Sequence, residues 1–498
     1  MKPTGNTSIS LSQIRKALNR GGGNPASVPQ RKGEYMRLRI FFAAVLTAML
    51  LTVPASAAES EPVRVAVIDT GISEIAISKT NLSLGRNYIF PKQTTSDTVG
   101  HGTAIASIIV GSKAAGIKGI CPEAILVPLV YYETNQDGET IKGDSTMLAK
   151  IIREAVENYD CKILNISSGV LTDTPVLREA VAWADKQGAL VISSVGNDGN
   201  DSVYYPGAYS SVLCVGSANE ANSAPADFSN RNEAVDLLAP GEKLPTATMK
   251  GNRLSASGTS FSTAYISGVA AKLMTEYPDL TAGQVRQILY ASATDFGTTG
   301  YDRESGWGIL NLEQAFVYAG KRCLFRDVEP SKWCFDGVNK AAKLGLLQGT
   351  SAVEFSPNKP TTRAMLWMML YRLQGLKPSE STGIWYRDAQ LWAIAKGISD
   401  GTNPNGTITR EQMAVMLYRY TATLGYDLGK RADLSKFSDA DSISSYAKDA
   451  LSWANANGLI NGTGTKTLSP QGNATRAQVA VIIIKLYDLV WDGTRRLF

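Results

Sequence analysis

The sequence predicts an α/β domain, built on a parallel sheet flanked by helices, followed by a C-terminal all-α repeat array. The first indication is a series of near-continuous apolar segments between residues 62 and 320, typical of strands covered on both faces. The second is the alternation of these segments with stretches of helical period. The third is a change after Gly320, where short helical patterns rich in aromatic residues recur in three copies.

Five segments of the first region are expected to be strands because they are short, apolar and bounded by turn residues. They are residues 63–69, 163–167, 189–194, 212–216 and 235–239. Apolar residues at helical spacing between these strands predict helices around 148–155, around 181–184 and at 262–277. This order of elements favours a parallel sheet with helices on both faces.

The N-terminal region has the features of a secretory signal peptide at residues 36–57. Arg37 and Arg39 precede an uncharged apolar run at 40–53, and a small-residue motif ending at Ala57 follows. Residues 1–35 indicate either that the start codon was assigned too early or that the n-region is extended. We favour the first interpretation, in which translation begins at Met36. The apolar run is too short for a comfortable membrane span, so no transmembrane segment is expected after signal cleavage.

Composition limits the other classes of function. The chain has 498 residues, which predicts two or more domains, and its net charge is +5. Residues 1–57 contain eight basic residues and one acid, so the remainder is slightly acidic and no nucleic-acid partner is expected. The five cysteines do not form a disulfide framework, although Cys323 and Cys334 are close enough in sequence to pair after secretion.

Three separated residues supply the groups of a nucleophilic catalyst. Asp69 ends the first predicted strand, and His101, the only histidine, lies in a glycine-rich block. Ser260 follows Gly258-Thr259 and precedes a helical run, where the helix dipole would favour developing negative charge. A serine hydroxyl needs a base to activate it, and that base needs an orienting carboxylate. The three residues therefore indicate a nucleophile, a general base and its orienting acid.

Residues 62–320, within an expected domain at 58–320, resemble subtilisin-like serine proteases, so a subtilisin-like parallel sheet is the implied fold. The signature blocks are Asp69-Thr70-Gly71, His101-Gly102-Thr103 and Gly258-Thr259-Ser260, and two further blocks match the substrate-binding strand and the oxyanion segment, Asn165-Ile166-Ser167-Ser168-Gly169 and Ser194-Val195-Gly196-Asn197. The resemblance implies hydrolysis of protein or peptide substrates through an acyl-enzyme formed on Ser260. It also implies an oxyanion hole at Asn197 and substrate-binding roles for Ser167, Ser168, Gly169 and Gly196.

The resemblance leaves two points open. The loop at 111–119 lacks carboxylate and asparagine side chains, so we carry over no calcium site, and we expect neither a metal nor a cofactor. The alternative to a protease is a non-catalytic surface protein that uses an inactive protease fold as a scaffold.

The C-terminal copies resemble S-layer homology domains, with expected boundaries at 321–375, 383–425 and 436–490. Their shared Thr-Arg block supplies Arg363, Arg410 and Arg476. The resemblance implies binding to a secondary cell-wall polysaccharide, and an arginine fork suits an anionic sugar substituent. The same arginines also fit ordinary first residues of helices. Together the two regions predict a secreted protein attached to the bacterial cell wall or S-layer.

Overall fold

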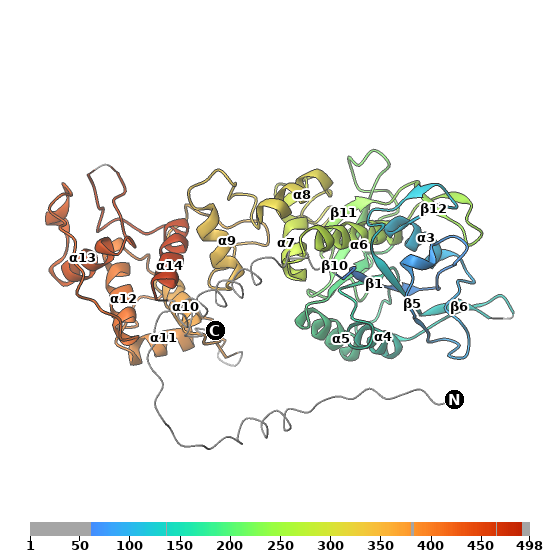
Figure 1. Cartoon of the computed structure of the whole chain (residues 1–498), viewed down its shortest axis with the longest axis horizontal. Helices are drawn as coiled ribbons and strands as arrows, with labels where there is room; N and C mark the ends of the chain where they lie inside the picture. The colour runs from blue at the N-terminus through green and yellow to red at the C-terminus, as the bar shows by residue number, and fades with distance from the viewer. Residues whose placement is uncertain (1–60, 136, 380–382, 465, 491–498) are drawn as a thin grey trace, which may run out of the picture. The chain divides into compact units, whose positions relative to one another are not determined.

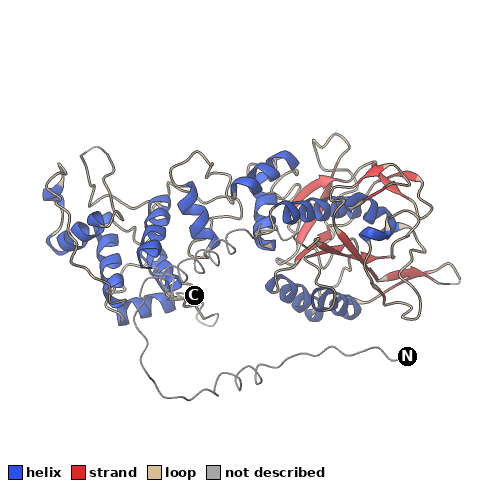
Figure 2. Cartoon of the chain, viewed as in Figure 1, coloured by secondary structure: helices blue, strands red, loops and turns tan. Residues whose placement is uncertain are grey.

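The computed structural model describes residues 61–135, 137–379, 383–464 and 466–490. The predicted signal peptide at 36–57 and the preceding residues 1–35 lie outside them. Within the described part, the first half of the chain is an α/β domain and the second half is helical (Figures 1 and 2). This confirms the predicted fold class.

A seven-stranded parallel sheet, in the order β11-β10-β9-β8-β1-β5-β2, forms the centre of the α/β domain. Its strands are β1 (Arg64–Asp69), β2 (Arg86–Asn87), β5 (Ile125–Val130), β8 (Ile163–Ile166), β9 (Leu190–Ser194), β10 (Leu213–Ala218) and β11 (Leu237–Pro240). All five predicted strands are present. Strand β5 was not predicted, and Pro128 in its middle lacks the N–H that a ladder uses.

Helices cover both faces of the sheet, as the alternating pattern predicted. On one face lie α4 (Ser145–Glu157) and α5 (Pro175–Lys186), and on the other lie α3 (His101–Ile109) and α6 (Thr259–Glu276). Side chains alternate along β1, so Val65 and Val67 pack with α3 and α6, while Ala66 and Ile68 pack with α4 and α5. The same alternation directs Asp69 toward the face that carries α3 and α6.

Three short antiparallel hairpins surround the sheet. They pair β3 (Gly111–Ser112) with β4 (Ile117–Lys118), β6 (Tyr132–Thr134) with β7 (Thr140–Lys142), and β12 (Leu244–Ala247) with β13 (Arg253–Ala256). The β6–β7 hairpin follows β5 directly, because only Tyr131 separates the two strands. This hairpin therefore begins at the carboxyl end of the sheet.

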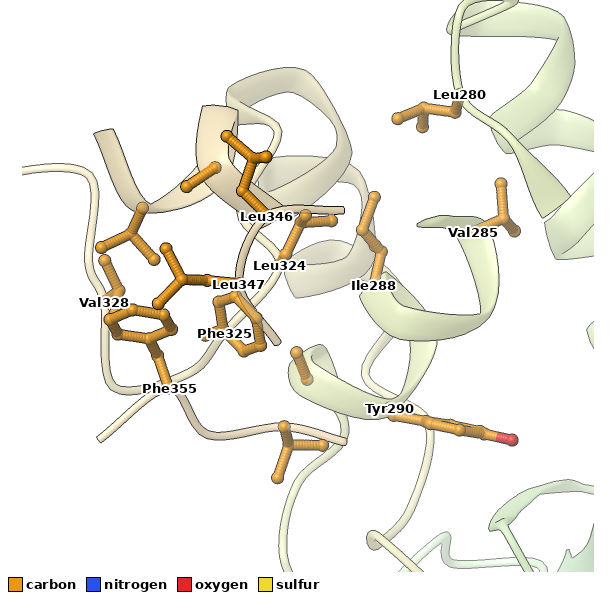
Figure 3. Close-up of a cluster of buried hydrophobic side chains, with 14 of the residues drawn as sticks. Leu280, Val285, Ile288, Tyr290, Leu324, Phe325, Val328, Leu346, Leu347 and Phe355 are labelled. Carbon is orange, nitrogen blue, oxygen red and sulfur yellow. The ribbon is translucent and has the colours of Figure 1, made fainter. Parts of the chain in front are cut away.

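A continuous apolar cluster joins the end of the α/β domain to the first repeat (Figure 3). Val285 and Ile288 from α7 (Ala282–Ser292) belong to the same buried cluster as Leu324 and Leu347. Helix α8 (Leu312–Lys321) ends at residue 321, where the first repeat is expected to begin. The chain therefore passes into the repeats through a buried segment.

The repeats form three helix pairs that close into a ring. The pairs are α9 (Phe335–Lys343) with α10 (Arg363–Leu373), α11 (Arg387–Ala395) with α12 (Arg410–Thr423), and α13 (Lys448–Ala456) with α14 (Arg476–Val490). Packing runs between copies, because α10 contacts α11, α12 contacts α13, and α14 contacts α9. Main-chain N–H groups of Thr361, Ala474 and Ile408 donate in a cycle to the carbonyls of Ala474, Ile408 and Thr361, at 2.9, 3.0 and 2.9 Å. Each copy thus buries its apolar face against its neighbours.

The suggested pairing of Cys323 with Cys334 is wrong, because both are buried free thiols. The Cys323 thiol instead lies 3.4 Å from the Phe325 carbonyl and 3.6 Å from the Val328 carbonyl. Among the described residues, every helix is too short or too polar to cross a bilayer, and no three His, Cys, Asp or Glu side chains gather as a metal site would require.

Candidate active site

Asp69 occupies the last position of β1, where an open parallel sheet presents its functional groups. Its side chain is fully buried, and its Oδ1 accepts a hydrogen bond from the Thr70 N–H at 2.8 Å. The Thr70 hydroxyl oxygen in turn accepts from the Gly102 N–H at 2.8 Å. These contacts tie the end of β1 to the start of α3.

His101 is the first residue of α3, and Asp97 fixes how that helix begins. Asp97 accepts from the N–H groups of Gly100 and Thr103 at 2.7 and 2.9 Å, and from the Thr103 hydroxyl at 2.6 Å. Gly102 must lack a side chain, because a Cβ there would lie 2.2 Å from the Gly71 carbonyl oxygen. The helix consequently approaches β1 closely enough for His101 to reach Asp69.

The structure brings His101 and Asp69 into direct contact. The His101 Nδ1 lies 2.8 Å from Asp69 Oδ1 and 2.9 Å from Asp69 Oδ2. Burial opposes a charge on the imidazole, but the charge and hydrogen bond of Asp69, aided by Asp97, outweigh it and raise the pKa of His101. The pair has the geometry of a general base held by a carboxylate.

Ser260 is the second residue of α6, and its side chain is buried beside the segment that is expected to bind substrate. Its hydroxyl donates to the Ser167 carbonyl at 3.1 Å, and the Ser167 hydroxyl donates to the Ser260 carbonyl at 3.3 Å. Within the described residues, no hydrogen bond joins Ser260 to His101. The structure therefore pairs Asp69 with His101, while the hydroxyl of Ser260, the predicted nucleophile, is hydrogen-bonded to the main-chain carbonyl of Ser167.

Asn197 lies in the loop after β9 and contacts the start of α6. Its Oδ1 accepts from the Thr259 N–H at 2.8 Å and from the Thr259 hydroxyl at 2.9 Å. This use of the amide oxygen leaves Nδ2 as the side-chain donor, and this atom would lie 3.7 Å from a Cβ placed on Gly258, the N-cap of α6. An amide donor beside a helix N-terminus is suited to stabilising an oxyanion.

The four residues expected to bind substrate lie on two adjacent strand ends. Ser167, Ser168 and Gly169 follow β8, and Gly196 follows β9. A Cβ at Gly169 or Gly196 would lie 2.9 and 2.7 Å from atoms of Tyr204, so both glycines make room for this ring. The sequence patterns gave no indication of Tyr204, because nothing local connects it to either strand.

Tyr132 is a second residue that the sequence analysis missed. It is the first residue of β6, and its hydroxyl lies 2.9 Å from His101 Nδ1 and 3.2 Å from Asp69 Oδ1. The register of the sheet pairs Asp69 with Val130, so Tyr132 comes two residues after the partner of Asp69. If β5 had been predicted as a neighbour of β1, its end would have placed Tyr132 near Asp69.

The three repeat arginines all join neighbouring copies. Arg363 donates to the Thr402 carbonyl and pairs with Asp400, while Arg410 donates to the carbonyls of Leu468 and Asn461, and Arg476 to those of Phe355 and Gln348. Arg410 and Arg476 are only 4% and 5% exposed. Each arginine is the first residue of its helix, as the plainer interpretation expected.

Comparisons with known proteins agree with this division of the chain. The profile of the subtilase family matches residues 60–308, and that of the S-layer homology domain matches 324–364 and 436–480. The middle copy is not matched by that profile, so a third such repeat stays a prediction.

Several proteases of known sequence are similar to the first half. The minor extracellular protease Epr of Bacillus subtilis (strain 168) is 33% identical over 57% of this chain and 43% of its own length. Subtilisin Savinase of Lederbergia lenta is 31% identical over 51% of this chain and 90% of its own length. The thermostable alkaline protease of Halalkalibacterium halodurans is 33% identical over 47% of this chain. The chain spans 43% and 63% of the lengths of Epr and the alkaline protease.

Proposed function

Because the chain belongs to the subtilase family and carries S-layer homology domains, we propose that it is a serine endopeptidase anchored to a bacterial cell wall. The observation that carries the enzymatic part is the double contact of His101 with Asp69 beside the N-terminus of α6, where Ser260 lies. The proposed reaction is hydrolysis of peptide bonds in exported proteins or peptides.

In this proposal, Ser260 attacks the peptide carbonyl and His101 accepts its proton. Asp69 holds Nδ1 protonated, which leaves Nε2 as the atom that takes the proton and later gives it to the leaving amine. For this step the Ser260 hydroxyl must leave the Ser167 carbonyl, to which it donates at 3.1 Å in this structure. Asn197 Nδ2 and the Ser260 N–H stabilise the oxyanion, and water then hydrolyses the acyl-enzyme.

Labelling with a fluorophosphonate tests the nucleophile. We expect the mature chain to be labelled at Ser260, and Ser260→Ala to remain unlabelled. Ser262→Ala is the matched control, because this neighbouring serine is also buried in α6 and should leave labelling intact. Failure of the wild-type chain to react, where a control protease reacts, would refute the enzymatic proposal in favour of an inactive scaffold.

The anchoring part of the proposal concerns two grooves between repeats. One has a volume of about 150 Å³ and is lined by Arg372, Trp385 and Arg476, and the other, of about 260 Å³, is lined by Arg363, Arg419 and Tyr446. In each groove the arginines come from two of the copies, and an exposed aromatic side chain comes from the remaining copy. Arginine forks suit anionic sugar substituents, and flat rings offer apolar surface to sugar rings.

Within these grooves the repeat arginines have two roles in our proposal. Their carbonyl contacts hold adjacent copies together, and Arg363 and Arg476 also form part of the groove walls. Arg372 and Arg419 each follow the Thr-Arg arginine of their copy by nine positions and supply the second cation. The polymer would therefore bind between copies.

Sedimentation of the full-length Ser260→Ala chain with isolated cell walls tests this anchor. We expect co-sedimentation that is lost when the polysaccharide is stripped from the walls. Replacing both Arg372 and Arg419 by alanine should reduce the bound fraction, whereas Arg303→Ala, an exposed arginine of the α/β domain, should not. Binding that survives both polymer removal and the double substitution would refute the proposal.

A further inference from the structure

Tyr132 contacts both members of the paired acid and base. Its hydroxyl lies 2.9 Å from His101 Nδ1 and 3.2 Å from Asp69 Oδ1, and its ring centroid lies 6.2 Å from that of His101. The residue is half-buried at the base of the β6–β7 hairpin. Neither the subtilase signature blocks nor the proposed triad includes it.

The direction of the hydrogen bond follows from the donors available. Nδ1 of the productive imidazole carries a proton and donates it to Asp69, so Nδ1 has no lone pair to accept a second proton. The Tyr132 hydroxyl can then donate only to the Asp69 carboxylate. Burial, followed by the nearby charges of Asp69 and Asp97, raises the pKa of the Tyr132 phenol well above its usual value, so the phenol keeps its proton.

We propose that Tyr132 is a positioning residue, whose hydroxyl donates to Asp69 and so controls how strongly this carboxylate holds the His101 imidazolium. The inference rests on the proposed function, because it concerns the base of that reaction. With Tyr132 in place, Asp69 accepts from three donors, which are Thr70 N–H, His101 Nδ1–H and the phenol. A carboxylate with more donors is oriented more firmly and attracts the imidazolium less strongly.

The other groups around His101 do not change the sign of this effect. Asp69 faces the imidazole from β1, and Asp97 acts on it from the segment before α3. The Phe261 ring of α6 is uncharged, with its centroid 5.7 Å from that of His101. Removal of the Tyr132 hydroxyl therefore strengthens the hold of Asp69 on the imidazolium. The base then becomes neutral, and hence active, only at higher pH.

The test compares Tyr132→Phe with Tyr131→Phe. Both substitutions remove one hydroxyl and keep the ring, but the Tyr131 hydroxyl donates to the Asp144 carbonyl, away from the site. Because His101 is the only histidine, an NMR titration of histidine-labelled full chain reports this one site without ambiguity. The titration is done in the Ser260→Ala background, which prevents self-digestion, and kcat/KM against pH is measured in the active chain.

We expect Tyr132→Phe to raise the His101 midpoint by about half a pH unit or more, and to shift the acid limb of kcat/KM by the same amount. On that limb, kcat/KM should fall at least about threefold, while Tyr131→Phe leaves both measurements unchanged. An unchanged or lowered midpoint in Tyr132→Phe would overturn the proposal. Absence of wild-type turnover would instead refute the proposed function, and the titration would still decide the role of Tyr132.

Discussion

The buried environment of Asp236 leads us to expect that the α/β domain loses folding stability as the pH rises from about 4 to 6. It lies just before β11, its Oδ2 accepts from the Cys214 N–H at 2.7 Å, and Tyr290 of α7 also hydrogen-bonds to it. Burial raises the pKa of Asp236 from 3.8 to about 6, although its hydrogen bonds and Arg286 favour the ionised form. The substitution Asp236→Asn keeps the shape of the side chain and removes its ionisation.

The sign of the effect follows from the direction of this shift. The folded state holds its proton more tightly than the unfolded chain, so Asp236 penalises the folded state once the pH rises above about 4. The penalty is complete above pH 6. A rise in the pKa of Asp236 from 3.8 to about 6 corresponds to a loss of about 3 kcal/mol in the free energy of unfolding. Because the residue is partly exposed to solvent, we expect a loss of roughly 2 kcal/mol. The Asp236→Asn variant should not lose this stability as the pH rises, because asparagine does not ionise.

Calorimetric unfolding of the Ser260→Ala chain, with and without Asp236→Asn, at pH 4 to 8 measures this effect. As the pH rises, the Tm of the variant should increase relative to that of its parent. The expected increase is roughly 2 to 4 °C for each kcal/mol by which ionised Asp236 destabilises the parent. His101 also has a raised pKa, but it is present in both chains and cancels in the comparison. A difference in Tm that stays constant from pH 4 to 8 would refute the reasoning, because lost hydrogen bonds alone give an offset independent of pH.

Three further substitutions test the chemistry and packing of the site and the packing of the repeats. Asn197→Ala should lower kcat by about 10²- to 10³-fold with little change in KM, and unchanged kcat in steady-state assays would remove it from the oxyanion site. Gly102→Ala should inactivate and destabilise the chain, because its Cβ would lie 2.2 Å from the Gly71 carbonyl oxygen, and full activity would contradict that geometry. Arg410→Ala should cost the repeats about 2 kcal/mol in chemical unfolding, because it removes the donor of the buried Leu468 carbonyl and of the partly buried Asn461 contact, and a loss below about 1 kcal/mol would contradict this role of Arg410.

Local pattern was sufficient to predict the general architecture. Apolar runs bounded by turns identified five strands, and repeated helical blocks identified the C-terminal array. Strand β5 was missed because Pro128 interrupts its pattern, although the structure pairs it with β1 and places its last residue, Val130, opposite Asp69. On the side facing the edge of the sheet, β5 is paired at Leu126, Leu129 and Val130, and the proline falls between the first two of these residues.

The sequence by itself determined which candidate groups this protein has available. The single histidine, the aspartate that ends a strand and the serine at a helix start predict a base, its orienting acid and a nucleophile, because residue type and local period can be read from the chain alone. Only the tertiary structure decided which of these groups touch. It paired His101 with Asp69, added Tyr132 to that pair, and directed the repeat arginines to carbonyls of neighbouring copies. Such contacts depend on strand register and helix packing between distant segments, which no local pattern records.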